Sequence, residues 1–185
     1  DGEILVRGEN IMNGYWNDPV ATSSTIINGW VHTGDIGEFD EEQYLKITDR
    51  KKDIIVNAGG DNISPSRVEE KLNIEPEIAQ SMLYGDFKNF LVAIIVPDKD
   101  QAIIWAKKNN KNTDIKSLIK DEDFIKMMKE ITSKVNSRLS VIEQVRKFIL
   151  VDEEFTIEND MMTPTMKVKR FKVKEIFGDQ LEDLF

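Results

Sequence analysis

The chain has 185 residues, of which 40% are hydrophobic and 32% are charged, and its formal net charge is −9. A chain of this size can bury one core, or one core and a small second unit. The acidic balance argues against a nucleic-acid partner, because a phosphate backbone requires a broad basic face. The sequence has no cysteine, which excludes disulfides, thiolate zinc ligands and a thiol nucleophile.

A cytoplasmic location is the expectation from the apolar pattern. The longest apolar run, residues 90–96, is far too short to cross a bilayer. The first residues lack the charged and apolar regions of a signal peptide. We therefore expect neither a membrane span nor export.

Residues 1–48 predict short strands separated by turns that are rich in Gly or Asp. The predicted strands are 3–7, 30–33, 36–39 and 44–48. These elements are too few to bury a core of their own, and Asp1-Gly2 leads directly into a strand. We therefore expect a short all-β remnant of a larger domain, and a chain that is a fragment of a longer protein.

The remainder predicts an α+β fold, a small mixed sheet with helices packed on it. Predicted strands are 53–57, 78–86, 90–97 and 147–151, the second and third forming a hairpin. A helix should begin after Ser64, a plausible N-cap followed by Pro65. Apolar residues at three- and four-residue spacing predict helices over about 99–140, and residues 171–185 predict a closing helix.

The segment HTGDIG, residues 32–37, is the first candidate site. A Gly-Asp pair at a turn between two strands would project the carboxylate of Asp35 beside exposed backbone, where it could accept both hydroxyls of a ribose. The structural alternative is a plain hairpin turn, since Gly and Asp are common turn residues. His32 is predicted to be a structural strand residue, because the sequence has no second His to complete a metal site.

The segment TDRKKDIIVNAGGDNISP, residues 48–65, is the second candidate site. Arg50 directly follows a predicted strand and could direct its guanidinium at phosphate or ribose. Gly59 and Gly60 would let a ligand approach the backbone closely. Taken alone, a solvated charge run followed by a loop is the better interpretation, and only the combination with the other segments favours a site.

The third candidate site is TPTMKVKR, residues 163–170. Residues 161–174 contain five basic side chains and no acidic one in a chain of net charge −9. A Thr-Pro-Thr turn could hold Lys167 rigidly, so that its charge meets negative charge developing in phosphoryl chemistry. A solubilising basic helix start is the alternative, although cations there oppose the helix dipole.

Taken together and in order, these segments resemble the adenylate-forming (AMP-binding) superfamily of acyl-CoA synthetases, luciferases and peptide adenylation domains. The resemblance covers the whole chain, from GEILVRGENIMNGYW through WVHTGDIG and DRKKDIIVNAGGDNISPSRVEE to TPTMKVKR. AGGDNISP, TPTMK and the long helical insert look most like the long-chain fatty acid–CoA ligases. The implied chain is a C-terminal fragment of such a ligase, with residues 1–49 ending the large adenylation domain and 50–185 forming the mobile C-terminal lid domain.

The resemblance implies a role for each candidate residue. Asp35 would bind the ribose hydroxyls and Arg50 the nucleotide, so both are nucleotide-binding candidates. Lys52 would be the hinge of the lid, and Gly59 with Gly60 would border the CoA channel. Lys167 would be the catalytic lysine, bridging the acyl carboxylate and the α-phosphate.

The resemblance also implies the reaction and its partners. A fatty acid and ATP would form acyl-AMP, and CoA would then displace AMP while the lid rotates between the two steps. The phosphate loop, the acyl pocket and the Mg²⁺ ligands would lie in the missing N-terminal domain, so the fragment alone is expected to be inactive. Peripheral membrane contact through that missing part is left open.

Two other functions share these residues. One is an acyl-AMP ligase that delivers its acyl group to a carrier protein. The other is a stand-alone binding module that has kept the lid fold without the chemistry. A glycine-rich phosphate loop upstream of Asp1 would establish the enzyme class.

Overall fold

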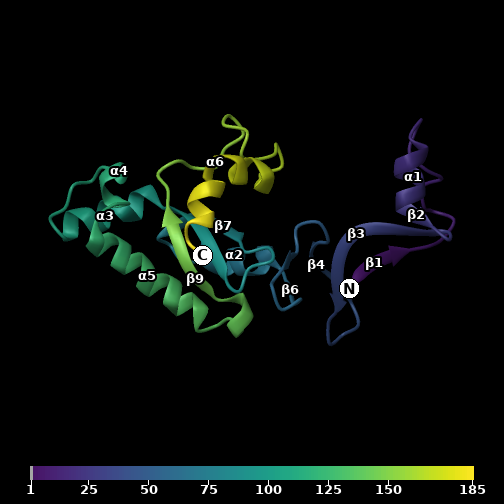
Figure 1. Ribbon diagram of the computed structural model, residues 1–185, viewed down its shortest axis with the longest axis horizontal. Helices are drawn as coiled ribbons and strands as arrows, with labels where there is room; N and C mark the ends of the chain where they lie inside the picture. Colours follow the sequence, from purple (N-terminus) through teal and green to yellow (C-terminus); the bar gives the residue numbers. More distant parts are fainter. Residues whose placement is uncertain (1) are drawn as a thin grey trace. The chain divides into compact units, whose positions relative to one another are not determined.

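The computed structural model describes residues 2–185, and the chain divides into two compact units, Asp1–Ile54 and Ile55–Phe185. The elements of each unit can be followed along the colour scale of Figure 1. The domain boundary predicted from the sequence, between residues 49 and 50, lies inside the first unit.

The first unit is a small antiparallel sheet built around one long strand. Its central strand, β3, pairs with all three others. The elements are β1 (Glu3–Val6), α1 (Pro19–Thr25), β2 (Ile26–Ile27), β3 (Trp30–Phe39) and β4 (Leu45–Arg50). The predicted strands are therefore present, with one correction.

The correction concerns HTGDIG, which we predicted to be a turn between two strands. In the structure it lies inside the single strand β3, because residues of this segment pair with β1 and with β4, so that strand pairing continues along it. Gly34 adopts φ +71°, a left-handed conformation that glycine accepts without strain. The ladder with β4 shifts register between Ile36 and Gly37, so a local bulge replaces the turn.

The first unit has no hydrophobic core among its described residues, as expected from its few elements. Asp49 is its only buried residue within 2–54. Large apolar side chains are instead accessible, including Trp16, which is 92% exposed, and Val20, which is 77% exposed. Pairing across the sheet therefore holds this unit together more than side-chain burial does.

The second unit contains the predicted mixed sheet. Strand β8 (Leu91–Pro97) runs antiparallel to β7 (Ile78–Tyr84) and parallel to β9 (Val145–Leu150). The short strands β5 (Ile55–Val56) and β6 (Asn62–Ile63) form a separate ribbon. The helices are α2 (Pro65–Asn73), α3 (Lys99–Lys108), α4 (Ile115–Leu118), α5 (Glu122–Asn136), the 3₁₀ turn Val141–Glu143 and α6 (Arg170–Glu182). The α+β fold class is confirmed.

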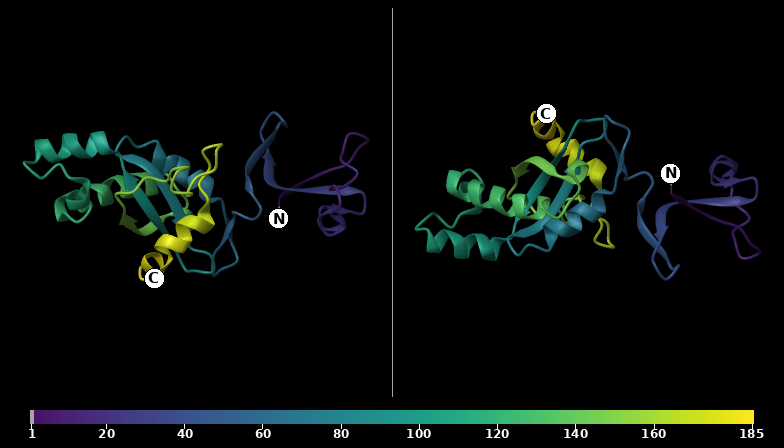
Figure 2. Two further views of the ribbon diagram at one scale, coloured as in Figure 1. Left: turned by 90° about the horizontal axis from the view of Figure 1, so that it is seen from above. Right: turned by 90° about the horizontal axis from the view of Figure 1, so that it is seen from below.

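Strand β8 is buried on both faces and divides the core into two layers. Leu91, Ala93 and Ile95 pack with residues of α2, α3 and α5. Val92, Ile94 and Val96 pack with α6 and with the segment 151–162. The alternation follows from the two-residue period of a strand. Figure 2 shows α6, in yellow, lying along this sheet.

Helix α2 begins where the sequence predicts. The N-cap is Ser64, whose hydroxyl accepts the N–H of Arg67 at 3.3 Å, and Pro65 occupies the first turn. The helix buries Val68 and Leu72 in the core. It thus fixes the loop that precedes it, which carries Gly59 and Gly60, to the body of the second unit.

Candidate functional site

Asp35 and Arg50, the two predicted nucleotide-binding residues, are direct cross-strand partners. They face each other in the β3–β4 register, and Arg50 Nε lies 2.7 Å from Asp35 Oδ1. The Asp35 side chain is 22% exposed and that of Arg50 is 54% exposed. Within residues 2–185, no other residue forms a hydrogen bond or ion pair with either side chain. The pair therefore presents both an acceptor and donors to a ligand.

Glu3 connects three sequence segments that the motif analysis treated separately. Its carboxylate accepts the Lys51 ammonium at 2.8 Å and the Gly34 N–H at 3.1 Å, and it lies 3.1 Å from His32 Nδ1. Its side chain is only 8% exposed. Bonding to Lys51, then to His32, lowers the pKa of Glu3 from 4.5 to about 2. His32 lies in β3, where its ring contacts this carboxylate, and its structural role stays a prediction.

Glu3 was missed as an organising residue by the sequence analysis. The available signal was its place in the Gly-Glu strand of the resemblance, but its partners lie 29 to 48 residues away. Only the β1–β3 register and the bond from Gly34 N–H show that this carboxylate lies against the backbone that precedes Asp35. Glu3 therefore supports the backbone that positions Asp35.

Lys52, the predicted hinge residue, lies in an exposed turn at the end of the first unit. The carbonyl of Arg50 accepts the N–H groups of Asp53 at 2.9 Å and Ile54 at 3.1 Å, which closes the turn over Lys51 and Lys52. The N–H of Lys51 donates to Gly34 O at 2.8 Å. The N–H of Lys52 has no acceptor within residues 2–185. Its hinge role stays a prediction.

Gly59 and Gly60 lie in an exposed loop organised by Asn57. The Asn57 side-chain oxygen accepts the N–H groups of Gly59 and Asp61, both at 2.9 Å, and Gly60 N–H donates to Asn57 O at 3.0 Å. Gly60 adopts φ +86°, and a Cβ built there would meet nothing within 4 Å. The loop therefore offers open, pre-shaped backbone, which is what the predicted channel role requires.

Lys167 lies in an exposed, tightly bonded loop after Thr163-Pro164-Thr165. Two hydrogen bonds join Thr163 to the backbone of Lys167: Thr163 N–H donates to Lys167 O at 2.8 Å, and Lys167 N–H donates to Thr163 Oγ1 at 3.0 Å. Met166 takes a left-handed conformation at φ 59°, and Met162 pairs with Val168. The loop is therefore a small hairpin that holds the lysine backbone while its side chain is exposed.

The other basic side chains of the tail have partners in the second unit. Lys169 pairs with Asp160, Lys172 with Glu175 at 2.8 Å, and Arg170 with Glu69 at 2.6 Å. The Lys174 ammonium lies 4.8 Å from the Tyr84 ring centroid. These four contacts engage every basic side chain of residues 161–174 except that of Lys167.

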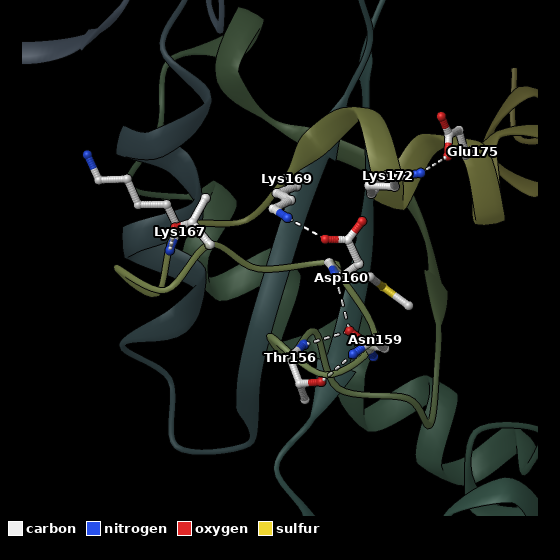
Figure 3. A network of polar contacts seen from close by, with 9 residues as sticks. Thr156, Asn159, Asp160, Lys167, Lys169, Lys172 and Glu175 are labelled. Atoms are coloured by element: carbon white, nitrogen blue, oxygen red, sulfur yellow. Dashed lines mark hydrogen bonds and ion pairs between the residues drawn. The ribbon is translucent and has the colours of Figure 1, made fainter.

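Of the five basic side chains in this segment, only that of Lys167 has no hydrogen-bond, ion-pair or aromatic-ring partner among residues 2–185. Figure 3 shows its side chain extending away from Asp160 and Lys169. An exposed ammonium on a fixed backbone can meet a negatively charged ligand without first breaking an internal ion pair. The fixed backbone, held by the two bonds to Thr163, distinguishes Lys167 from other exposed lysines of the chain.

Two features of the wider structure bear on metal and membrane contact. Within the described residues, no group of three or more His, Asp or Glu side chains is placed to hold a metal ion. None of the helices within residues 2–185 is both long and apolar enough to span a membrane.

Comparison with known proteins gives the chain's relatives. No protein-family model matches it. It is 39% identical over 187 residues to the long-chain-fatty-acid–CoA ligase FadD15 of Mycobacterium tuberculosis, and 36% identical over 189 residues to the human long-chain-fatty-acid–CoA ligase 1. The alignments cover 100% of this chain but 31% and 27% of those relatives.

The fold has solved counterparts. The adenylation domain of a carboxylate reductase from Mycobacterium chelonae superposes with a TM-score of 0.82 and 25% identity, over 99% of this chain and 27% of that one. The chain thus spans less than a third of the length of each of these three proteins.

Proposed function

We propose that this chain, which belongs to the adenylate-forming superfamily, is the C-terminal part of an ATP-dependent long-chain fatty acid–CoA ligase. The identity to fatty-acid–CoA ligases over the whole chain supports the proposal. The observation that carries it is the setting of Lys167. Its ammonium is exposed and has no internal partner among residues 2–185, and two hydrogen bonds with Thr163 fix its backbone.

The proposed reaction has two half-reactions. In the first, an oxygen of the fatty acid carboxylate attacks the α-phosphorus of ATP, the bond to the bridging oxygen breaks, and pyrophosphate leaves with that electron pair. In the second, the CoA thiol loses its proton and attacks the acyl carbon, and AMP leaves. The products are a thioester, AMP and pyrophosphate.

The residues of this chain take the following roles in the proposal. Lys167 donates hydrogen bonds to the acyl carboxylate and to an α-phosphate oxygen, so it stabilises charge that builds in the adenylation transition state. Asp35 accepts the ribose hydroxyls, and Arg50 both orients that carboxylate and contacts the nucleotide. Mg²⁺ would lower the negative charge of the triphosphate, and its ligands would belong to the part of the protein that precedes this chain.

The second half-reaction uses a different face of the lid in this proposal. Lys52 lies in the turn that precedes Ile55, where the second unit begins. A torsional change there would replace Lys167 at the reaction centre with the Gly59-Gly60 loop. The open backbone at Gly60 would then border the pantetheine of CoA.

The test is to measure each half-reaction in the full-length protein. Pyrophosphate exchange with a series of fatty acids reports the first, and conversion of supplied acyl-AMP with CoA reports the second. Lys167→Ala should lower exchange by about 10²–10³-fold, the cost of losing one preorganised charge. The thioester step should survive. Equal loss in both steps would remove Lys167 from its proposed role.

Two controls test the alternatives. Residues 1–185 alone should show no exchange, since the triphosphate and magnesium sites would be absent from them. Replacing CoA by a phosphopantetheinylated carrier protein should abolish thioester formation. Transfer to the carrier in preference to CoA would favour an acyl-AMP ligase, and a full-length protein inactive in both steps would favour a binding module.

A further inference from the structure

Glu69 and Arg170 form a bidentate ion pair between two helices of the second unit. Arg170 Nη1 donates to Glu69 Oε1 at 2.7 Å, and Nη2 donates to Oε2 at 2.6 Å. Glu69 Oε1 also accepts the N–H of Leu83 at 2.6 Å. Glu69 is 9% exposed, and the Arg170 side chain is 24% exposed. A parallel fork of this kind fixes both the distance and the orientation of its partners.

The pair lies at the base of the loop that carries Lys167. Arg170 is the first residue of α6, directly after Lys169, whose N–H donates to Met161 O at 2.8 Å. Lys167 is therefore separated from Arg170 by two residues. Whatever fixes Arg170 also fixes the end of the loop from which Lys167 extends.

A continuous set of contacts runs from the sheet to this loop. Leu83 belongs to β7, and its N–H holds the carboxylate of Glu69, which lies in α2. Glu69 in turn holds Arg170. Since β7 pairs with the fully buried β8, the contacts join the loop to the most rigid part of the unit.

We propose that Glu69 and Arg170 are positioning residues for Lys167: their ion pair anchors the lysine loop to α2 and the sheet. Neither side chain is required to touch a substrate for this role. The chemical meaning of the positioning rests on the function proposed above, but the anchoring itself does not.

The first test measures the anchoring without any activity. Amide hydrogen exchange is followed in the 185-residue chain and in Glu69→Gln, which keeps an oxygen for Leu83 N–H while removing the charge that holds the fork. The amides of Lys167 and Lys169, both hydrogen-bonded in the loop, should exchange about tenfold faster. Amides of β8 should change little.

Glu75→Gln is the matched control. Glu75 is a comparably buried carboxylate, 5% exposed, that pairs with Lys134 at 2.7 Å and Arg138 at 3.6 Å, away from the lysine loop. It undergoes the same change of charge in the same unit. In Glu75→Gln, the amide hydrogens of Lys167 and Lys169 should exchange as slowly as in the parent chain.

The second test uses the full-length protein and separates the two half-reactions. Glu69→Gln should lower pyrophosphate exchange by about tenfold, since a small displacement of a charged group is costly at a transition state. It should leave the acyl-AMP-to-CoA step within about twofold of the parent. Arg170→Lys keeps the charge but not the fork, and should give the same pattern with a smaller loss.

The outcomes are distinguishable. Two results for Glu69→Gln would overturn the positioning role. One is amide hydrogen exchange that is uniformly faster throughout the second unit. The other is a loss of activity equal to that of Glu75→Gln in both half-reactions. If instead the parent protein shows no pyrophosphate exchange, the proposed function fails, and the hydrogen-exchange comparison still decides whether the pair anchors the loop.

Discussion

Asp35 and Arg50 are joined across the β3–β4 ladder by a 2.7 Å ion pair, although the motifs that contain them are separate in the sequence. The strand register places them, since each is the other's cross-strand partner. Since the Arg50 side chain is 54% exposed, solvent screens the pair, and we expect it to contribute about 0–1 kcal/mol to folding. The ligand-binding role of the pair stays a prediction.

Replacing Asp35 with Asn should separate these two contributions. Loss of the charged acceptor should lower kcat/KM for ATP in pyrophosphate exchange by about 10- to 100-fold, because hydrogen bonds to a charged group contribute about 1.5–3 kcal/mol. The melting temperature should change little. Glu38→Gln, an exposed carboxylate on the same strand, is the control. A large loss of stability with unchanged kcat/KM would assign the pair to the fold alone.

Replacing Thr163 with Val should loosen the Lys167 loop. The substitution keeps the shape but removes the hydroxyl that accepts Lys167 N–H at 3.0 Å. We expect roughly a tenfold loss in pyrophosphate exchange, the cost of a small misplacement of a catalytic charge. The thioester step should be unchanged.

Thr165→Val is the control for that experiment. The Thr165 hydroxyl is exposed and contacts Thr163 Oγ1 at 3.0 Å, but it makes no bond to the lysine backbone. The rate of pyrophosphate exchange by Thr165→Val should stay within about twofold of the parent's rate. Comparable losses in the two variants would show that the hydroxyl bond to Lys167 is unimportant.

The secondary structure of the second unit could be largely predicted because its patterns are local. Residues 99–140 repeat at helical spacing, and the structure places α3, α4 and α5 there. The HTGDIG segment shows the opposite case. Gly-Asp is a local turn signal, but β1 and β4 impose ladder pairing from distant parts of the chain.

Long-range partners explain what the sequence could not show at the candidate site. Glu69 and Arg170 are 101 positions apart, and no periodicity links them. The five basic residues of the tail look alike in sequence, yet only tertiary contacts distinguish Lys167 from the four that have partners. The motif thus selected Lys167 as a candidate, and the tertiary contacts show that its ammonium is accessible.

The depressed pKa of Glu3 predicts a pH dependence of stability. Since the folded pKa is about 2 and the ordinary value is 4.5, the unfolded chain binds the proton more readily between these values. The stabilisation is therefore complete above about pH 4.5 and is lost as the pH falls toward 2. After a discount for the exposure of Lys51, we expect roughly 1–2 kcal/mol.

Urea unfolding of Glu3→Gln and the parent chain at a series of pH values checks this. Fluorescence of Trp30 reports the first unit if Trp16, already 92% exposed in the fold, and Trp105, in the second unit, are replaced by Phe. The two free energies of unfolding should differ most near neutral pH and converge below pH 4.5. A difference in the free energy of unfolding that stays constant down to pH 2 would contradict the lowered pKa of Glu3. Glu41 is exposed, so Glu41→Gln should unfold with the same free energy as the parent at each pH.

The hinge prediction depends on backbone hydrogen bonds around Lys52. Proline fixes φ near −65° and removes the amide donor. Lys52 N–H has no acceptor within residues 2–185, so proline there deletes no hydrogen bond of this structure. At Lys51 it would delete the bond to Gly34 O, which is 2.8 Å long. The two positions therefore separate a torsional effect from a lost hydrogen bond.

Lys52→Pro in the full-length protein should uncouple the two half-reactions, because a pivot residue must adopt two sets of torsions and proline permits one. We expect the acyl-AMP-to-CoA step to fall by at least about tenfold and pyrophosphate exchange to stay within about threefold, on the hypothesis that the adenylating arrangement accepts proline torsions. Lys52→Ala keeps backbone freedom and should leave both steps intact, whereas Lys51→Pro should lower stability. Near-normal rates in both half-reactions of Lys52→Pro would place the pivot elsewhere.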